Sequence, residues 1–178
     1  MIEVEQKFRV KNHTSIETRL SSLGYKRSDT VHQADKVFLL NSDNFKTFTP
    51  GDPVTRLRTV NGSTTLTFKR AINVEGDSVE HEMTINPASA GEGLLLEMGY
   101  KPATNIEKMR TEYKLGEITI ALDDVVGLGL FAEVEIVCSE GQADAARKKV
   151  LATADSLGLK AEDIETKKYD QLMSELSA

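Results

Sequence analysis

Pairs of like-charged residues recur along this sequence at a spacing of two. Arg56 and Arg58 form one such pair, and Lys108 and Arg110 form another. Residues two apart in a β-strand project from the same face of the sheet, so each pair can act on one ligand. Guanidinium and ammonium groups suit phosphate oxygens, whereas paired carboxylates suit a hard divalent ion such as Mg²⁺ or Mn²⁺. The acidic pairs at this spacing are Glu3 with Glu5, Glu80 with Glu82, and Glu133 with Glu135.

The first segment shows how such side chains are positioned. Residues 2–10 alternate between apolar side chains and charged ones, which predicts a strand with one apolar face and one charged face. Glu3, Glu5 and Lys7 share the charged face. The cations of the charged faces, to which phosphate would bind, are Lys7, Arg56, Arg58, Lys69, Lys108 and Arg110. A phosphoryl-transfer site combines cations, which bind a polyphosphate, with carboxylates, which bind the metal ion of that polyphosphate.

The dipeptide Asn61-Gly62 predicts a β-hairpin whose register can be derived residue by residue. A two-residue turn pairs Val60 with Ser63, because the turn length fixes the register of the flanking strands. Directly opposed residues share a face, so Arg56, Arg58 and Lys69 should project from one side of the hairpin. The pairs that follow from this register are Arg58 with Thr65, Arg56 with Thr67, and Val54 with Lys69, while the opposite face carries Leu57, Leu66 and Phe68.

The rest of the chain follows the same pattern of short strands and a few amphipathic helices. We expect about eight strands, mostly joined by hairpins, and therefore an α+β fold with an antiparallel sheet or barrel. On any single strand a charged face is ordinarily the solvated one. Here the opposite faces carry the apolar residues that helices must cover, so closure of the sheet would turn the charges into a lumen. The other segments expected are strands at 37–40, 78–85, 105–113, 117–123 and 130–138, helices at 16–23, 86–98, 143–157 and 169–176, and a polar loop at 41–53.

Length and composition narrow the class of protein. A chain of 178 residues and 19.6 kDa, with 39% hydrophobic and 28% charged residues, is typical of one globular domain. The net charge of −6 argues against a binder of duplex DNA that uses a broad basic surface. No apolar run approaches the roughly 20 residues of a membrane helix, and the acidic N-terminus is unlike a signal peptide. The single cysteine, Cys138, fits a reducing compartment, so we expect a cytoplasmic protein.

Several motifs resemble one known family when they are taken in order. They cover nearly the whole chain, from an ExExK motif at the N-terminus to a GLGxFxExE stretch. This set is similar to the CYTH family, the triphosphate tunnel metalloenzymes, and within that family most resembles class IV adenylate cyclases and thiamine triphosphatase-type proteins. The motifs are Glu3-Val4-Glu5-Gln6-Lys7, Arg56-Leu57-Arg58, Lys69, Ile106-Glu107-Lys108-Met109-Arg110, Asp123, and Gly127-Leu128-Gly129-Leu130-Phe131-Ala132-Glu133-Val134-Glu135.

The resemblance implies a fold, a site and a class of substrate. The fold would be an eight-stranded closed antiparallel barrel, the triphosphate tunnel, with helices packed outside, and residues 1–178 would form a single CYTH domain. Mg²⁺ or Mn²⁺ would be held by Glu3, Glu5, Glu133 and Glu135. The resemblance makes Lys7, Arg56, Arg58, Lys69, Lys108 and Arg110 the ligands of a triphosphate, and counts Lys7, Lys69 and Asp123 as catalytic, with Asp123 an acid near the metal or the nucleophile.

Family members either cyclise ATP to cyclic AMP and pyrophosphate or hydrolyse thiamine triphosphate, inorganic triphosphate or nucleoside triphosphates. The resemblance of the GLGxFxExE stretch favours the cyclase, with the triphosphatase as the alternative. One departure bears on this choice. Many members have an Asp-x-Tyr-Phe motif on an early strand, whereas Asp35-Lys36-Val37-Phe38 places Val37 at the tyrosine position. That departure counts against one hydrolytic mechanism, in which the tyrosine works with a lysine.

Hypotheses from other functional classes involve the same residues. A non-catalytic polyphosphate or nucleotide sensor would use the cations without productive metal geometry, although the two ExE pairs argue against it. Single-stranded RNA binding fits poorly, since aromatic residues make up only 6% of the chain. The histidines lack zinc-ligand spacing. Glu80 and Glu82 are either additional metal or lumen acids or a solvated face, and the terminal helix either packs on the body or supports a homodimer.

Overall fold

The computed structural model describes residues 2–40, 51–71, 78–139 and 141–176. Most of the loop expected at 41–53 lies outside these residues. The predicted strands and helices are all present, and the strand expected at 37–40 is longer, beginning at Val31. The elements are β1 (Ile2–Arg9), α1 (Thr14–Ser22), β2 (Lys26–Arg27), β3 (Val31–Leu39), β4 (Val54–Val60), β5 (Ser63–Ala71), β6 (Ser78–Ile85), α2 (Ala88–Glu97), β7 (Lys101–Leu115), β8 (Ile118–Val125), β9 (Gly129–Cys138), α3 (Ala143–Ser156), a 3₁₀ turn (Ala161–Asp163), β10 (Ile164–Glu165) and α4 (Tyr169–Leu176).

The strand order is β10-β1-β6-β5-β4-β3-β7-β8-β9, with an additional pairing of β1 to β9 and with β2 paired to β7. This is the strand order of a closed antiparallel barrel, and it confirms the predicted α+β fold class. Two-residue strands β2 and β10 are additions that the sequence did not predict. None of the described helices is long and apolar enough to cross a membrane.

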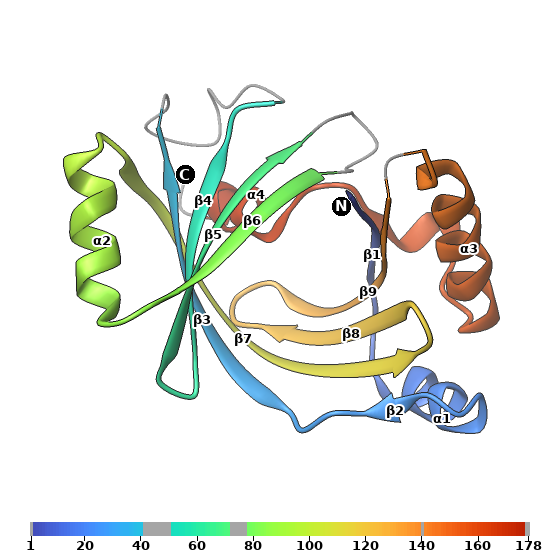
Figure 1. Ribbon diagram of the computed structural model, residues 1–178. Coiled ribbons are helices and arrows are strands. Elements are labelled where there is room, and N and C mark those ends of the chain that lie inside the picture. Colours follow the sequence, from blue (N-terminus) through green and yellow to red (C-terminus); the bar gives the residue numbers. More distant parts are fainter. Residues whose placement is uncertain (1, 41–50, 72–77, 140, 177–178) are drawn as a thin grey trace. The chain divides into compact units, whose positions relative to one another are not determined.

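The chain divides into two compact units, which we describe separately. Unit 1 comprises residues 1–31 and 109–166. Its core lies where α1 and α3 cover the apolar face of β1, β8 and β9, and Figure 1 shows α3 alongside β9. Val4, Val134 and Val150 are at most 1% exposed there. Burial of each such side chain stabilises the fold by about 1.5–3 kcal/mol. The apolar faces therefore stabilise unit 1, and the charged faces of the same strands are not part of its core.

Unit 2 comprises residues 32–108 and 167–178. Strands β3, β4, β5 and β6 pair in order, and α2 packs on the apolar face of this sheet against β4 and β6 (Figure 1). Phe38 and Leu57 of the sheet and Leu95 of α2 are buried together where the helix packs on the strands. A Cβ atom at Gly91 would lie 3.1 Å from the side chain of Ile85, so the glycine permits the close approach of α2 to the sheet.

The β4–β5 hairpin has the predicted register. Asn61 and Gly62 both have positive φ, at 50° and 79°, as the type I′ turn of an Asn-Gly hairpin requires. Val60 pairs with Ser63, and the pairings predicted for Arg56 and Arg58 are those observed. The turn therefore places both arginines on the face opposite α2.

Candidate functional site

Unit 2 carries a polar face on the side of its sheet opposite α2. The register of the four strands sets Asp35 beside Arg58, Arg56 beside Thr67, and Lys69 beside Glu80. We call this set the charged face of unit 2. It consists of Asp35, Arg56, Arg58, Thr67, Lys69, Glu80 and Glu82, together with Lys108 of β7, whose charge acts on Asp35.

Arg58 and Asp35 form a bidentate ion pair on this face. Arg58 donates from Nε and Nη2 to the two carboxylate oxygens of Asp35, at 2.7 Å in each case. Asp35 is only 4% exposed. Burial raises the pKa of Asp35, but the hydrogen bonds and charge of Arg58, with smaller contributions from Arg56 and Lys108, outweigh it and hold the pKa below its usual value. Asp35 is therefore a buried carboxylate that fixes the plane of the Arg58 guanidinium group.

The other acids of this face also lie beside cations. Lys69 Nζ lies 2.5 Å from Glu80 Oε1. Glu82 accepts a hydrogen bond from the Thr67 hydroxyl at 2.8 Å and lies 3.9 Å from Arg56 Nη2. Glu80 and Glu82 thus share the face of the phosphate-binding candidates and balance their charge.

Lys108 has an aromatic neighbour. Its Nζ lies 4.9 Å from the centroid of the Tyr169 ring, which belongs to α4. Lys108 is 2% exposed and Tyr169 is 9% exposed, so this cation–π contact is removed from solvent. The terminal helix therefore contributes a side chain to the charged face of unit 2.

Unit 1 carries the ExE pairs on the face opposite its apolar core. Strands β1 and β9 are paired so that Glu5 lies opposite Glu135 and Lys7 lies opposite Glu133. Glu3 projects from the same side of β1 as Glu5. The register thus gathers both predicted metal-ligand pairs on two neighbouring strands.

Arg110 and Asp123 form a second bidentate pair in unit 1. Arg110 donates from Nε to Asp123 at 2.7 Å and from Nη2 to the other oxygen at 2.5 Å, and Nη2 also contacts Glu133. Asp123 is fully buried. The arginine therefore links Asp123, on β8, to an acid of the GLGxFxExE stretch.

The carboxylates of unit 1 crowd one another electrostatically. Burial and the negative charges of Glu3, Glu5 and Glu133 raise the pKa of Glu135 to about 8, against the opposing effect of Arg110. A cluster of acids that keeps one member protonated has an excess of negative charge that a cation would relieve. As the described side chains are placed, no three His, Cys, Asp or Glu residues converge as a set of metal ligands.

The sequence does not predict the roles of two residues on these faces, and it identifies the position of a third only through a motif. It places Asp35 in the Asp-x-Tyr-Phe position but does not predict its pairing with Arg58. It predicts a helix at 169–176 but no role for Tyr169. Val37 is 3% exposed and pairs with Arg56 across β3 and β4, so it projects from the charged face of unit 2, where the family tyrosine was expected. Strand alternation from Val37 would have identified Asp35, whereas nothing in the sequence connects Tyr169 to Lys108.

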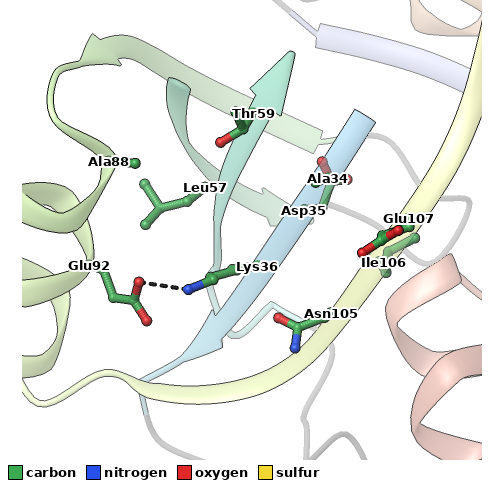
Figure 2. A pocket seen from close by; sticks show the side chains of 10 residues that line it. All are labelled: Ala34, Asp35, Lys36, Leu57, Thr59, Ala88, Glu92, Asn105, Ile106 and Glu107. Carbon is green, nitrogen blue, oxygen red and sulfur yellow. Dashed lines mark hydrogen bonds and ion pairs between the residues drawn. The ribbon is translucent and has the colours of Figure 1, made fainter. Parts of the chain in front are cut away.

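A pocket of about 280 Å³ lies elsewhere in unit 2, between α2 and the strands. Figure 2 shows Lys36 of β3 pointing across it to Glu92 of α2, at 2.8 Å, with Leu57 beside them. Lys36 and Leu57 alternate with Asp35 and Arg58 along their strands. The pocket therefore lies mainly on the α2 side of the sheet, although Asp35 of the charged face also contributes to its lining.

Comparison with known proteins is consistent with this arrangement. The CYTH domain model matches residues 1–169. A protein of Methanocaldococcus jannaschii named "Putative adenylate cyclase" is 27% identical over 175 residues, which cover 97% of this chain and 98% of that protein. A Pyrococcus horikoshii structure is similar with a TM-score of 0.83 at 28% identity, over 96% of this chain and 99% of that chain. A Vibrio parahaemolyticus structure described as a "putative adenylate cyclase" gives 0.82 at 26% identity, over 100% and 99%. The chain belongs to the CYTH domain family.

Proposed function

We propose that this protein is a divalent-metal-dependent enzyme that acts on a triphosphate, and that its reaction is the cyclisation of ATP to cyclic AMP and pyrophosphate. The observation that carries the proposal is the pairing of β1 with β9, which sets Glu5 opposite Glu135 and Lys7 opposite Glu133, where Arg110 also contacts Glu133. Excess acid calls for a metal ion, and fixed cations suit the phosphates that such an ion accompanies. The names of two relatives at 26% and 27% identity support the choice of cyclase.

The donor set of unit 1 fits a hard divalent ion. Glu3, Glu5, Glu133 and Glu135 would hold Mg²⁺ or Mn²⁺, since both ions prefer carboxylate oxygens. When bound, the ion would neutralise charge on the phosphates and on the departing pyrophosphate. Deprotonation of Glu135 is then part of metal binding, because a carboxylate ligand must be ionised.

The cations of each unit, taken separately, are the proposed ligands of phosphate groups. Arg58 is held in its plane by Asp35 and Arg110 by Asp123, so each guanidinium group presents a fixed set of donors. Fixed donors stabilise developing charge without reorganising during the reaction. Lys7, Arg56, Lys69 and Lys108 would complete the set of phosphate ligands. In this role Asp123 orients Arg110.

Cyclisation then requires that the ribose 3′ hydroxyl attack the α phosphorus. One P–O bond forms to the 3′ oxygen, the bond to the β-phosphate oxygen breaks, and the hydroxyl proton passes to solvent or to a base. Pyrophosphate leaves with its charge stabilised by the cations. Only this step needs a nucleoside, since the proposed cationic ligands bind phosphate groups alone.

A triphosphatase is the second candidate, because the cations proposed as ligands suit phosphate groups, which ATP shares with thiamine triphosphate and inorganic triphosphate. Water would replace the ribose hydroxyl as the nucleophile and attack the terminal phosphorus. The Val37 side chain on the charged face of unit 2 supplies no proton-transferring group for that step.

The test is an assay of purified protein with Mg²⁺ or Mn²⁺ and, in separate reactions, ATP, thiamine triphosphate and inorganic triphosphate. Phosphorus NMR or chromatography identifies the products. Cyclic AMP with pyrophosphate supports the cyclase, whereas orthophosphate makes the protein a triphosphatase named by its best substrate. Tight binding without any product would make it a sensor and refute the enzyme.

A further inference from the structure

Gln33 carries a buried amide oxygen on the charged face of unit 2. It lies on β3 two residues before Asp35, and residues two apart on a strand project from the same face. Gln33 is 7% exposed, and its Oε1 atom has no hydrogen-bond partner in the part of the chain that the structure describes. A buried polar atom without a partner costs stability. Gln33 is therefore a candidate for a group whose partner is a ligand.

Gln33 lies at one end of a series of cations on this face. The cations follow one another along the strands at positions level with successive residues of β3, namely Arg58 with Asp35, Arg56 with Val37, and Lys69 with Leu39. Gln33 lies about 7 Å further along β3 than Asp35, because each residue of a strand advances the chain by about 3.3 Å. The series of positive charges thus ends at an uncharged amide.

The chemistry of an amide differs from that of the cations beside it. Phosphate oxygens accept hydrogen bonds, so a phosphate group suits an arginine or a lysine but offers no donor to an amide oxygen. A nucleobase offers both kinds of group. Adenine presents its N6 amine beside the N7 acceptor, and a glutamine amide pairs with the two through one hydrogen bond in each direction. The buried oxygen of Gln33 therefore suits a base better than a phosphate.

We infer that Gln33 is a specificity-determining residue whose side-chain amide binds the adenine base of a nucleoside triphosphate. The inference rests on the proposed function for the phosphate ligands, and it deepens that function because cations alone do not distinguish ATP from inorganic triphosphate. The nucleotide would lie along the face with its phosphates at the cations and its base at Gln33.

The first test asks whether Gln33 has a partner in the ligand-free protein. Gln33→Met nearly keeps the volume of the side chain but removes the amide. Loss of a buried group without a hydrogen-bond partner should leave the midpoint of urea unfolding unchanged or raise it. Asp35→Asn, which breaks a bonded pair on the same strand, should lower the midpoint. A fall in Gln33→Met as large as that in Asp35→Asn would make Gln33 a structural residue and overturn the inference.

The second test compares ligands with and without a base. Calorimetric titration in a chelator, which prevents metal-dependent turnover, measures the affinities for ATP and for inorganic triphosphate. Gln33→Met should bind ATP about 5- to 30-fold more weakly than wild type, as expected for the loss of one or two hydrogen bonds. Its affinity for inorganic triphosphate should not change. Unchanged ATP binding, or equal losses for the two ligands, overturns the inference.

Nucleotide analogues identify the group that meets the amide. Purine ribonucleoside triphosphate lacks the N6 amine, whereas 2′-deoxy-ATP and 3′-deoxy-ATP each lack a ribose hydroxyl. Wild type should bind the purine analogue more weakly than ATP, and Gln33→Met should bind the two equally. If the effect of Gln33→Met disappears with a deoxy analogue instead, the amide meets the ribose and the assignment to adenine is wrong.

Ser78→Ala is the matched control variant. Ser78 is 1% exposed, its Oγ atom also has no hydrogen-bond partner among the described residues, and it lies two residues before Glu80 on β6. It projects from the same face but lies beyond Lys69, at the opposite end from Gln33. Ser78→Ala should leave the ratio of the ATP affinity to the inorganic triphosphate affinity unchanged. A fall in this ratio as large as that in Gln33→Met would contradict a local contact at Gln33.

The outcomes separate this inference from the proposed function. Wild type that binds inorganic triphosphate while Gln33→Met loses no ATP affinity keeps the function and overturns the inference. Wild type that binds neither triphosphate refutes the function, and saturation-transfer NMR with adenosine then decides the base contact alone. An adenosine signal that is lost in Gln33→Met supports the contact, whereas no signal in wild type overturns it. If Gln33→Met fails to fold, Gln33→Leu takes its place in every experiment.

Discussion

Asp35 accepts two hydrogen bonds from Arg58, each at 2.7 Å, whereas its sequence neighbour Lys36 makes an exposed ion pair with Glu92. Removing one partner of a buried pair leaves the other uncompensated, while an exposed pair contributes little. Asp35→Asn should therefore lower the free energy of unfolding by about 2–3 kcal/mol, and Glu92→Gln by less than about 1 kcal/mol. Urea unfolding at pH 7 measures both, and equal losses would contradict the assignment.

The same pair predicts an acid dependence of stability. The pKa of Asp35 is lowered in the folded protein, so the unfolded chain binds a proton first as the pH falls. The stabilisation is present above the unfolded pKa of about 3.9 and is lost as the pH falls through the folded pKa. Unfolding measured from pH 7 to pH 3 should show a shallower loss in Asp35→Asn than in wild type.

Arg58→Ala should weaken the binding of inorganic triphosphate about 10- to 100-fold, as expected for the loss of charge-assisted hydrogen bonds. It should also destabilise the fold by leaving Asp35 buried and uncompensated. The double variant Arg58→Ala with Asp35→Asn should recover stability but not affinity. Arg70→Ala, at an exposed position next to Lys69 on β5, is the control. Calorimetric titration that finds wild-type affinity in Arg58→Ala would exclude Arg58 from the phosphate ligands.

Glu133→Gln combined with Glu135→Gln should abolish metal-dependent turnover at every metal concentration. An amide oxygen carries no negative charge and is a weaker ligand for a hard divalent ion than a carboxylate oxygen. Glu117→Gln, which removes only an exposed partner of Lys149, should retain activity. Turnover by the double variant at saturating Mn²⁺ would place the metal site elsewhere.

Glu135 should make the metal-free protein less stable as the pH rises. Its pKa is about 8 in the folded protein and about 4.3 in an unfolded chain. Between these values the folded state binds the extra proton, so the free energy of unfolding falls with increasing pH and levels off above about 8. Thermal unfolding in a chelator should show this decline in wild type and a smaller one in Glu135→Gln. Added Mg²⁺ or Mn²⁺ should raise the wild-type melting temperature most at alkaline pH.

Val37→Tyr should raise the release of orthophosphate from inorganic triphosphate, because it introduces a phenol on the charged face beside Arg56. Val37 is 3% exposed, so the larger side chain will also cost about 1–3 kcal/mol of stability. Val37→Phe matches the added volume without the hydroxyl and isolates the chemical effect. Equal rates in the two variants would show that a phenol at this position does not limit hydrolysis.

The sequence predicts on which strand face a charged residue lies better than it predicts which residue it pairs with. The Asn61-Gly62 turn predicts the β4–β5 pairing because a two-residue turn permits one register, and alternation then places Arg56, Arg58 and Lys69 together. The partners come from contacts between distant segments. Arg58 is 23 residues from Asp35, and Lys108 meets a ring on a helix that begins at Tyr169. Neither separation carries a periodic signal, so no local pattern identifies the pair.

The raised pKa of Glu135 could not be predicted either. The ExE spacing places two acids on one strand face, but the shift depends on the register that sets Glu5 opposite Glu135. An even spacing along a strand predicts which side chains share a face. The electrostatic crowding of Glu135 depends instead on the pairing of two strands that are more than 100 residues apart in sequence.

The two-residue turn at Asn61 and Gly62 has a consequence for how this gene can change during evolution. An insertion or deletion of one residue there would shift the parity of β5 and exchange Lys69 and Thr67 with Phe68 and Leu66 across the sheet. A substitution in the turn would strain the backbone locally, but the insertion or deletion of one residue would move every side chain of β5 to the opposite face of the sheet. Descendants of this sequence should therefore vary the residues of the hairpin tip more freely than its length.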